Sequence, residues 1–121
     1  MSFPEPSAQE NPVGIEGMAF LEYTSAHSDA LRQLFKRLGF SRTGKHKEKR
    51  VDFFEQNECT FLLNEEPGSF AENFHKMHGP SISAMGWKVT NAQRAFETAV
   101  KRGARPFEGK NATFPFPAVY G

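Results

Sequence analysis

The sequence predicts an α+β fold in which a strand-then-helix unit occurs twice and is completed by its full set of further strands only in its first copy. A strand-like apolar run at residues 17–25 precedes an amphipathic helical pattern that ends at Gly39. A second such run at residues 81–90 precedes a helical pattern that ends at Gly103. Because the two copies of a duplicated unit must pack in related ways, this repeat constrains the fold more than local propensity does.

The first copy predicts β-α-β-β-β order within residues 14–63. Its first strand is apolar on both faces, which is typical of a sheet covered on both sides. The helix that follows should have Ser28 or Asp29 as its N-cap and should bury one stripe at i, i+3, i+4 and i+7 spacing. This stripe is formed by Leu31, Leu34, Phe35 and Leu38. Three further strands complete the unit, the last two joined by a two-residue hairpin turn; they are expected at residues 40–46, 51–56 and 59–63.

The rest of the chain predicts a linker and a second, incomplete copy. The linker at residues 64–80 should contain a short helix, because Ser69 and Glu72 have the spacing of a capping box. The second copy should occupy residues 81–121, with Asn91 as the N-cap of its helix. Beyond that helix the pattern predicts only two weak strands, and the prolines in the last one favour an edge strand or an extended arm. These strands are expected at residues 105–110 and 112–120.

The helices and the sheet should share a core that is rich in aromatic side chains, since thirteen residues are phenylalanine. Tyr23 and Trp87 occupy equivalent places in the two copies, 64 positions apart. The residues expected to be buried are Leu31, Leu34, Phe35, Phe53, Phe61, Leu63, Trp87 and Phe96.

Composition narrows the class of protein. A chain of 121 residues can bury one core, and a formal net charge of +1 does not favour binding to nucleic acid or to a membrane surface. No apolar run approaches the roughly 18 residues that span a bilayer, and residues 1–13 predict a flexible tail rather than a signal peptide. The single Cys59 favours a reducing compartment, and its apolar surroundings predict a buried thiol. We therefore expect a cytoplasmic protein.

Few residues form patterns typical of a site. His75 and His78 lie three apart on the linker helix, but a metal site needs a third ligand at fixed geometry, and the other histidines are not expected to converge with them. Glu22 and Glu55 lie in strand-like runs, where positions at the rim or on a solvated edge are favoured over a general acid–base pair. The charged run at residues 45–50 should form a solvated turn. We therefore predict no catalytic, cofactor-binding or metal-binding residue in this chain.

Four strings occur in the order and spacing typical of one family. They are NPVGIEGMAFLEYTS, LFKRLGF, FLLNEEPGSFAENFHKMHGPS, and AMGWKV followed by AFETAVKRGARP. The repeated β-α-β-β-β unit resembles the vicinal-oxygen-chelate superfamily, which includes glyoxalases and bleomycin-resistance proteins and whose tandem units form a cupped sheet around a metal. The strings narrow the resemblance to the amino-terminal half of bacterial 4-hydroxyphenylpyruvate dioxygenases, over residues 11–121.

This resemblance implies part of a non-haem Fe(II) enzyme of tyrosine catabolism, which converts 4-hydroxyphenylpyruvate and O2 into homogentisate and CO2. In that family the two-histidine, one-carboxylate iron site belongs to the carboxyl-terminal half, which would be the partner of this chain within one polypeptide. The amino-terminal half is a degenerate copy. Gly17 stands where a chelating domain would place a ligand histidine, and residues 82–84 offer no ligand either. The resemblance therefore implies a non-catalytic half that holds no iron.

Two other functions stay open. 4-Hydroxymandelate synthase belongs to the same family and uses the same substrate and iron but hydroxylates the side chain, and the residues that separate the two should line the iron pocket. A stand-alone small-molecule-binding module of the same superfamily would need two complete units or a dimer that shares strands. An unpaired strand edge and the apolar residues after Pro106 also lead us to expect a homo-oligomer.

Overall fold

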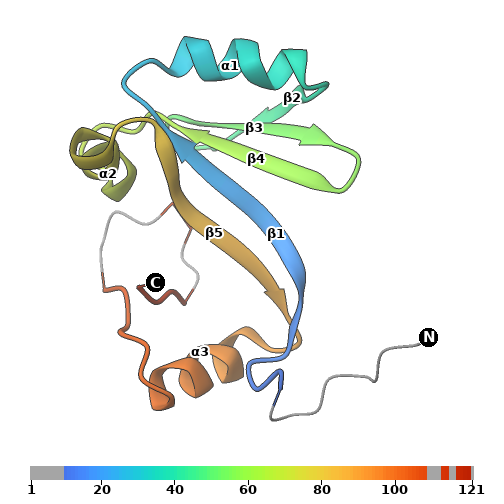
Figure 1. The fold of residues 1–121 in the computed structure, drawn as a ribbon, viewed down its shortest axis with the longest axis vertical. Helices are drawn as coiled ribbons and strands as arrows, with labels where there is room; N and C mark the ends of the chain where they lie inside the picture. Colours follow the sequence, from blue (N-terminus) through green and yellow to red (C-terminus); the bar gives the residue numbers. More distant parts are fainter. Residues whose placement is uncertain (1–9, 109–112, 115–116, 121) are drawn as a thin grey trace. The chain divides into compact units, whose positions relative to one another are not determined.

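The computed structural model in Figure 1 describes residues 10–108, 113–114 and 117–120. Its elements are β1 (Ile15–Thr24), α1 (Ser28–Arg37), β2 (Ser41–Lys45), β3 (Val51–Gln56), β4 (Cys59–Asn64), α2 (Phe70–His78), β5 (Ser81–Val89) and α3 (Ala92–Lys101). This order confirms the elements predicted up to residue 101, whereas the division of the chain into modules stays a prediction. Within the described residues, no helix has the length and apolar character needed to cross a bilayer.

The five strands form one mixed sheet in the order β2-β3-β4-β1-β5. β3 and β4 are an antiparallel hairpin, and its two-residue turn holds Asn57 at a φ of 53°, a left-handed conformation that asparagine tolerates. β4 runs parallel to β1, with Leu21 opposite Phe61. β5 lies beyond β1 at the edge of the sheet, and the arrowheads of these two strands point in opposite directions in Figure 1.

The chain forms two compact units. We call unit A the one with residues 18–86 and 113–114, and unit B the one with residues 10–17, 87–108 and 117–120. The division falls inside β1 and inside β5, so both of these strands contribute to both units. The compact units therefore do not coincide with the two copies of the sequence repeat.

Unit A has an aromatic core between α1 and the strands β2, β3 and β4, which α1 covers in Figure 1. Phe35 is 1% exposed, and its ring centroid lies within 5.2 Å of the ring centroids of Tyr23, Phe54 and Phe61. Phe40 stacks on Phe61 at 4.1 Å. Tilted and stacked rings at these distances add ring–ring attraction to the burial of apolar area, so this cluster stabilises unit A.

The prediction of the core is correct for most residues of unit A. Phe35 and Leu63 are buried, and the remaining predicted core residues of this unit are partly buried; they are Leu31, Phe53 and Phe61. Leu34 was predicted to be buried, and this is wrong, because 46% of it is exposed. The core contacts of α1 come from Leu31 and Phe35, so the buried stripe is narrower than the apolar pattern of the sequence.

The two ends of α1 differ in how closely they match the prediction. The N-cap is His27 rather than Ser28 or Asp29, and its side chain makes no capping hydrogen bond. The Ser28 hydroxyl donates to the Ser25 carbonyl at 3.2 Å. At the other end Gly39 has a φ of 95°, and the N–H of Phe40 donates to the carbonyl of Phe35 at 2.9 Å. Glycine is favoured in this left-handed position, as the sequence predicted.

The short helix α2 begins with the predicted Ser69 cap. The Ser69 hydroxyl accepts a hydrogen bond from the N–H of Glu72 at 3.0 Å. The Glu72 carboxylate accepts from the N–H of Gly68 at 3.3 Å rather than from that of Ser69, so the capping box is shifted by one residue. This backbone hydrogen bond, and after it the hydrogen bond from Lys76, hold the pKa of Glu72 below its ordinary value.

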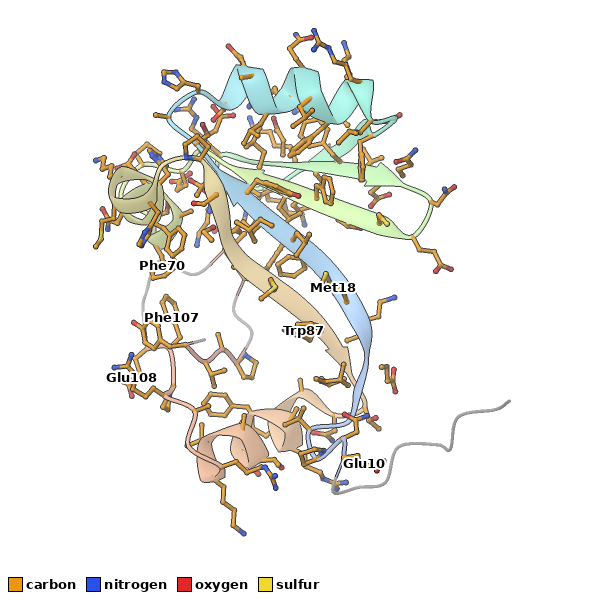
Figure 2. All side chains as sticks on the ribbon, in the orientation of Figure 1. Glu10, Met18, Phe70, Trp87, Phe107 and Glu108 are labelled. Atoms are coloured by element: carbon orange, nitrogen blue, oxygen red, sulfur yellow. The ribbon has the colours of Figure 1, made fainter. Side chains whose placement is uncertain are left out.

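Unit B contains α3, whose N-cap is the predicted Asn91. The Asn91 side-chain oxygen accepts from the N–H of Arg94 at 2.9 Å. No residue of α3 is fully buried, and Phe96 is only partly covered. Trp87 was predicted to be buried, and this is wrong, because it is 48% exposed. Trp87, which is labelled in Figure 2, belongs to β5, the last strand in the order of the described sheet.

After α3 the described residues of unit B form an antiparallel bridge instead of the predicted strands. This isolated bridge joins Pro106 to Val119. Beside it the ring centroid of Tyr120 lies 5.3 Å from that of Phe107, and the guanidinium of Arg105 lies 5.2 Å from the centroid of the Tyr120 ring. Of the strands predicted at 105–110 and 112–120, residues 109–112 and 115–116 lie outside the described residues.

Cys59 is exposed, so the prediction of a buried thiol is wrong. It is the first residue of β4, directly after the hairpin turn, and it lies opposite Gln56. The apolar run to which it belongs becomes buried only from Leu62 onward, because the hairpin projects beyond the core at its turn.

Candidate functional site

The face of the sheet opposite α1 carries a buried carboxylate. Tyr23 points toward α1, where its ring contacts Phe35, and successive side chains of a strand point to opposite faces. Glu22 therefore lies on the other face, where it is 4% exposed. The sequence predicted a position at the rim for Glu22, and this is wrong. The strand alternation alone could have placed it opposite Tyr23, but nothing in the sequence indicates what covers it.

Glu22 is held by hydroxyl groups from two distant parts of unit A. Its Oε2 accepts from the Ser83 hydroxyl at 3.2 Å, and its Oε1 accepts from the Thr113 hydroxyl. The Asn64 side-chain amide donates to the same Thr113 oxygen at 3.2 Å, while its own oxygen accepts from the N–H of Glu66 at 2.8 Å. We call Glu22, Asn64, Ser83 and Thr113 the Glu22 cluster. It joins β1, β4, β5 and residue 113 through partly buried hydrogen bonds.

Aromatic rings adjoin the Glu22 cluster on the same face. The ring centroid of Phe114 lies 5.6 Å from that of Phe20, 6.3 Å from that of Phe53 and 5.9 Å from that of His46. The ring of Phe20 also lies close against the backbone of Gly86, where an added Cβ would stand only 2.6 Å from its Cζ. Phe114 therefore sits over an apolar floor beside the buried carboxylate.

The geometry indicates that the Glu22 cluster holds segments of the chain in position and so has a structural role. Among the described residues, every buried side-chain nitrogen or oxygen has a hydrogen-bond partner. A carboxylate removed from water is costly unless it is hydrogen-bonded, and the hydroxyl donors meet that requirement. Loss of one donor would leave a buried acceptor unsatisfied, so the cluster fixes the positions of the segments that supply these donors.

The second carboxylate considered from the sequence, Glu55, does not join Glu22. Glu55 is exposed on β3, opposite Thr60, whereas Glu22 lies opposite Leu62. Because β4 lies between β1 and β3, two strand spacings of about 4.8 Å separate the two residues. The structure therefore does not bring the two carboxylates together as an acid–base pair.

The four histidines lie in three separate parts of the chain, and one of them, His27, is the N-cap of α1. His75 and His78 lie in the last turn of α2, and the ring of His78 contacts that of Phe74 at 4.5 Å. His46 accepts from the N–H groups of Glu48 and Lys49 through Nδ1, both at 3.1 Å, and so belongs to the turn at residues 45–50. Within the described residues, no three or more His, Cys, Asp or Glu side chains converge as metal ligands.

An ion-pair network on the α1 side of unit A has no signal in the sequence. Arg32 contacts Asp29 at 2.9 Å, Asp52 at 3.1 Å and also Glu65. Arg42 contacts Asp52 at 3.1 Å, so α1, β2 and β3 are tied together. A hollow of about 320 Å³ adjoins the network at the N-terminus of α1. Arg50 also lies 3.8 Å from Glu65, so three arginines face three carboxylates, and this balance of charge favours a structural role for the network.

Comparison with known proteins identifies the family. A family model described as hydroxyphenylpyruvate dioxygenase, HPPD, N-terminal, matches residues 9–121. Protein MelA of Shewanella colwelliana is 43% identical over 115 residues, which is 95% of this chain and 33% of MelA. The 4-hydroxyphenylpyruvate dioxygenase of Pseudomonas aeruginosa is 39% identical over 109 residues, which is 88% of this chain and 30% of that enzyme.

A solved structure shares the fold as well as the sequence. It is a fusion protein of a xylose isomerase-like TIM barrel with 4-hydroxyphenylpyruvate dioxygenase, with a TM-score of 0.78 and 36% identity, over 88% of this chain and 18% of the fusion protein. These similarities confirm the predicted family resemblance and the glyoxalase-type α+β fold. The chain spans about a third of the length of the curated relatives that it matches.

Proposed function

The chain belongs to the family of hydroxyphenylpyruvate dioxygenase amino-terminal domains, and we propose that it is the non-catalytic, amino-terminal part of an Fe(II)-dependent 4-hydroxyphenylpyruvate dioxygenase. The whole enzyme would convert 4-hydroxyphenylpyruvate and O2 into homogentisate and CO2 in the tyrosine catabolism of the cytoplasm. The observation that carries this proposal is the 39% identity with the Pseudomonas aeruginosa enzyme across 88% of the chain.

The described residues do not fit an iron centre. Non-haem iron oxygenases hold the metal with two histidines and one carboxylate and keep positions open for substrate and oxygen, and no such group converges in the described part of this chain. Gly17, at the position where the family resemblance would place a ligand histidine, has no side chain that could bind a metal. We therefore propose that the carboxyl-terminal part of the polypeptide holds the iron, and we assign no step of the reaction to these residues.

We propose two binding partners for this chain. The first is the carboxyl-terminal part of the same polypeptide, because the matched enzyme is about three times longer than this match. The second is another copy of the chain, since the edge strand β5 exposes Ile82 and Met85. Light scattering of the chain at about tens of micromolar, a range in which weak interfaces are populated, tests self-association; a clean monomer would contradict it.

The test of the proposed function compares two polypeptides. The first is the 121-residue chain, and the second is the chain continued through whatever its gene encodes beyond Gly121. We expect the longer polypeptide to contain iron, to consume O2 when 4-hydroxyphenylpyruvate is added, and to release homogentisate, while the shorter one does none of these. Stoichiometric iron together with substrate-dependent O2 uptake by the 121-residue chain would overturn the proposal.

The same experiment distinguishes the alternatives. Release of 4-hydroxymandelate instead of homogentisate would identify a mandelate synthase. A reading frame that joins this domain to a barrel would favour a fusion enzyme, for which the similar TIM-barrel fusion protein is the precedent. Saturable binding of a small molecule by a chain that is complete at Gly121 would favour a stand-alone binding module.

A further inference from the structure

We propose that the ribbon formed by β1 and β5 contains a hinge centred on Gly17, about which unit A and unit B move as separate bodies. The function proposed above assigns no motion to this domain. Three features of the two strands support the hinge: where the compact units divide, how few strands flank β1 at that level, and which residues stand there.

The division between the compact units crosses both strands. In β1 it falls between residues 17 and 18, and in β5 it falls between residues 86 and 87. Every other helix and strand belongs wholly to one unit. β1 and β5 are therefore the regular elements that carry the chain from one unit to the other.

Hydrogen bonds within each unit show that the two crossing points lie at the same level of the ribbon. In unit B the N–H of Thr90 donates to the carbonyl of Gly14 at 3.0 Å. In unit A the Ser83 hydroxyl donates to Oε2 of Glu22 at 3.2 Å. The two strands are neighbours and run in opposite directions in Figure 1, so counting inward from either pair brings both crossing points together to within about one residue. The division thus cuts the ribbon nearly straight across.

The sheet is narrow at this level. β1 pairs with β4 at residues 21–23, and β5 is its other neighbour in the sheet. In the described part of the chain, residues 15–20 of β1 therefore have only β5 beside them. A ribbon of two strands is marginally stable by itself and twists more strongly than a wide sheet. Gly17 lies in this two-stranded stretch, where bending disturbs the fewest hydrogen bonds.

Each of the two strands contains one glycine, and both glycines border the division. At Gly86 the ring of Phe20 occupies the place of a side chain, so packing requires glycine there. At Gly17 an added Cβ would meet nothing within 4 Å, and Gly17 is not among the glycines with a positive φ. Neither space nor backbone geometry therefore requires glycine at this position. What Gly17 adds is backbone freedom, which weakens a strand interior and allows a few φ and ψ angles to absorb a hinge motion.

The experiment measures residual dipolar couplings of the backbone amides in the isotopically labelled 121-residue chain by NMR. The couplings of each unit define the alignment of that unit, so two rigidly joined units must share one alignment. We expect the units to require separate alignments, with an order parameter of unit B relative to unit A below about 0.6, a value typical of flexible backbone. One alignment common to both units would overturn the proposal.

Gly17→Val tests whether the hinge depends on this glycine. A β-branched side chain restricts the backbone and suits a strand, and the place of its Cβ is free. The order parameter of unit B should rise toward about 0.85, a value typical of rigid backbone. Gly17→Ala is a smaller change that keeps the test decisive if Gly17→Val does not fold, and it should raise the order parameter by less.

Gly44→Ala is the matched control for Gly17→Ala. Gly44 is also a strand glycine, and an added Cβ there would make an ordinary contact with Phe53 at 3.4 Å, but β2 lies wholly within unit A. Its order parameter should equal that of the unchanged chain. An unchanged value in whichever Gly17 variant folds, or an equal rise in Gly44→Ala, would overturn the proposal. Since the measurement needs neither iron nor turnover, its outcome does not depend on the proposed dioxygenase function.

Discussion

The helices α1 and α3 come from two copies of one sequence pattern, yet they are buried to very different extents. α1 buries Phe35 to 1% exposure beneath its apolar stripe, whereas no residue of α3 is fully buried. α1 covers the strands β2, β3 and β4, and unit B offers its helix no comparable set of strands among the described residues. The comparison teaches that an apolar stripe selects the face of a helix, while the partner of that face decides the depth of burial.

The same two helices differ in the opposite sense at their N-termini. α3 has a side-chain cap from Asn91, and α1 begins at His27 without one. Helix formation in proteins depends mainly on packing of the apolar face, and capping matters most where that packing is weak. We therefore expect α1 to depend on its core contacts and α3 to depend on its cap.

The largest expected effect is the loss of the Phe35 ring. Phe35→Ala should lower the free energy of unfolding by about 3–5 kcal/mol, because it leaves a cavity among rings that can only partly collapse. The matched change in α3, Phe96→Ala, should cost about 1–2 kcal/mol, because Phe96 is only partly buried. Urea unfolding followed by circular dichroism measures both values. Equal costs at the two positions would show that α3 is as deeply packed as α1.

Two strand glycines extend the comparison to the sheet. Gly86→Ala should destabilise the chain by about 1–3 kcal/mol, because the new methyl group would overlap the ring of Phe20. Gly17→Ala is the control, since an added Cβ meets nothing within 4 Å, and its effect should stay within about 0.5 kcal/mol. A tolerated Gly86→Ala would mean that Phe20 turns away without cost, and the floor beneath Phe114 would then be less rigid than described.

The caps give a third and smaller contrast. Asn91→Ala removes the hydrogen bond to the N–H of Arg94 and should cost about 0.5–2 kcal/mol. His27→Ala removes no side-chain capping bond and should change the stability by no more than about 0.5 kcal/mol. Amide hydrogen exchange in the first turns of α1 and α3 would localise the effects. Equal losses of protection in both helices would contradict the expected difference.

The smallest expected effect is a pH dependence of stability that arises from Tyr23 in the core of unit A. Burial raises the pKa of the Tyr23 hydroxyl above its ordinary value of about 10, because the phenolate is disfavoured away from water. The contribution of the Tyr23 hydroxyl to the free energy of unfolding is fully present below the pKa that it has in the unfolded state. This contribution is lost as the pH rises from that value through the higher pKa of the folded state. Tyr23→Phe should therefore leave stability nearly unchanged at neutral pH and should reduce its fall above about pH 10. Unfolding curves across that range measure this, and identical alkaline profiles for both proteins would exclude the effect.

The amino-acid sequence was sufficient to predict the order of elements up to α3, because that order depends on local signals. Gly39 and Gly103 end α1 and α3 in left-handed conformations, and Asn91 and Ser69 cap their helices as expected. The spacing of apolar residues within one helix or strand depends only on that segment, so it can be recognised without knowledge of the rest of the chain. The family resemblance, confirmed over residues 9–121, was likewise contained in the order of short strings.

Burial and the Glu22 cluster were decided by the tertiary structure alone. Leu34 and Trp87 have apolar patterns like those of buried neighbours, but 46% of Leu34 and 48% of Trp87 is exposed. Glu22 is buried, and Thr113 and Ser83, separated from it by 91 and 61 positions, supply the donors that it requires. Such contacts join residues with no periodic relation in the sequence. Local patterns therefore determined which segments form helices and strands, and only packing determined which of their side chains leave water.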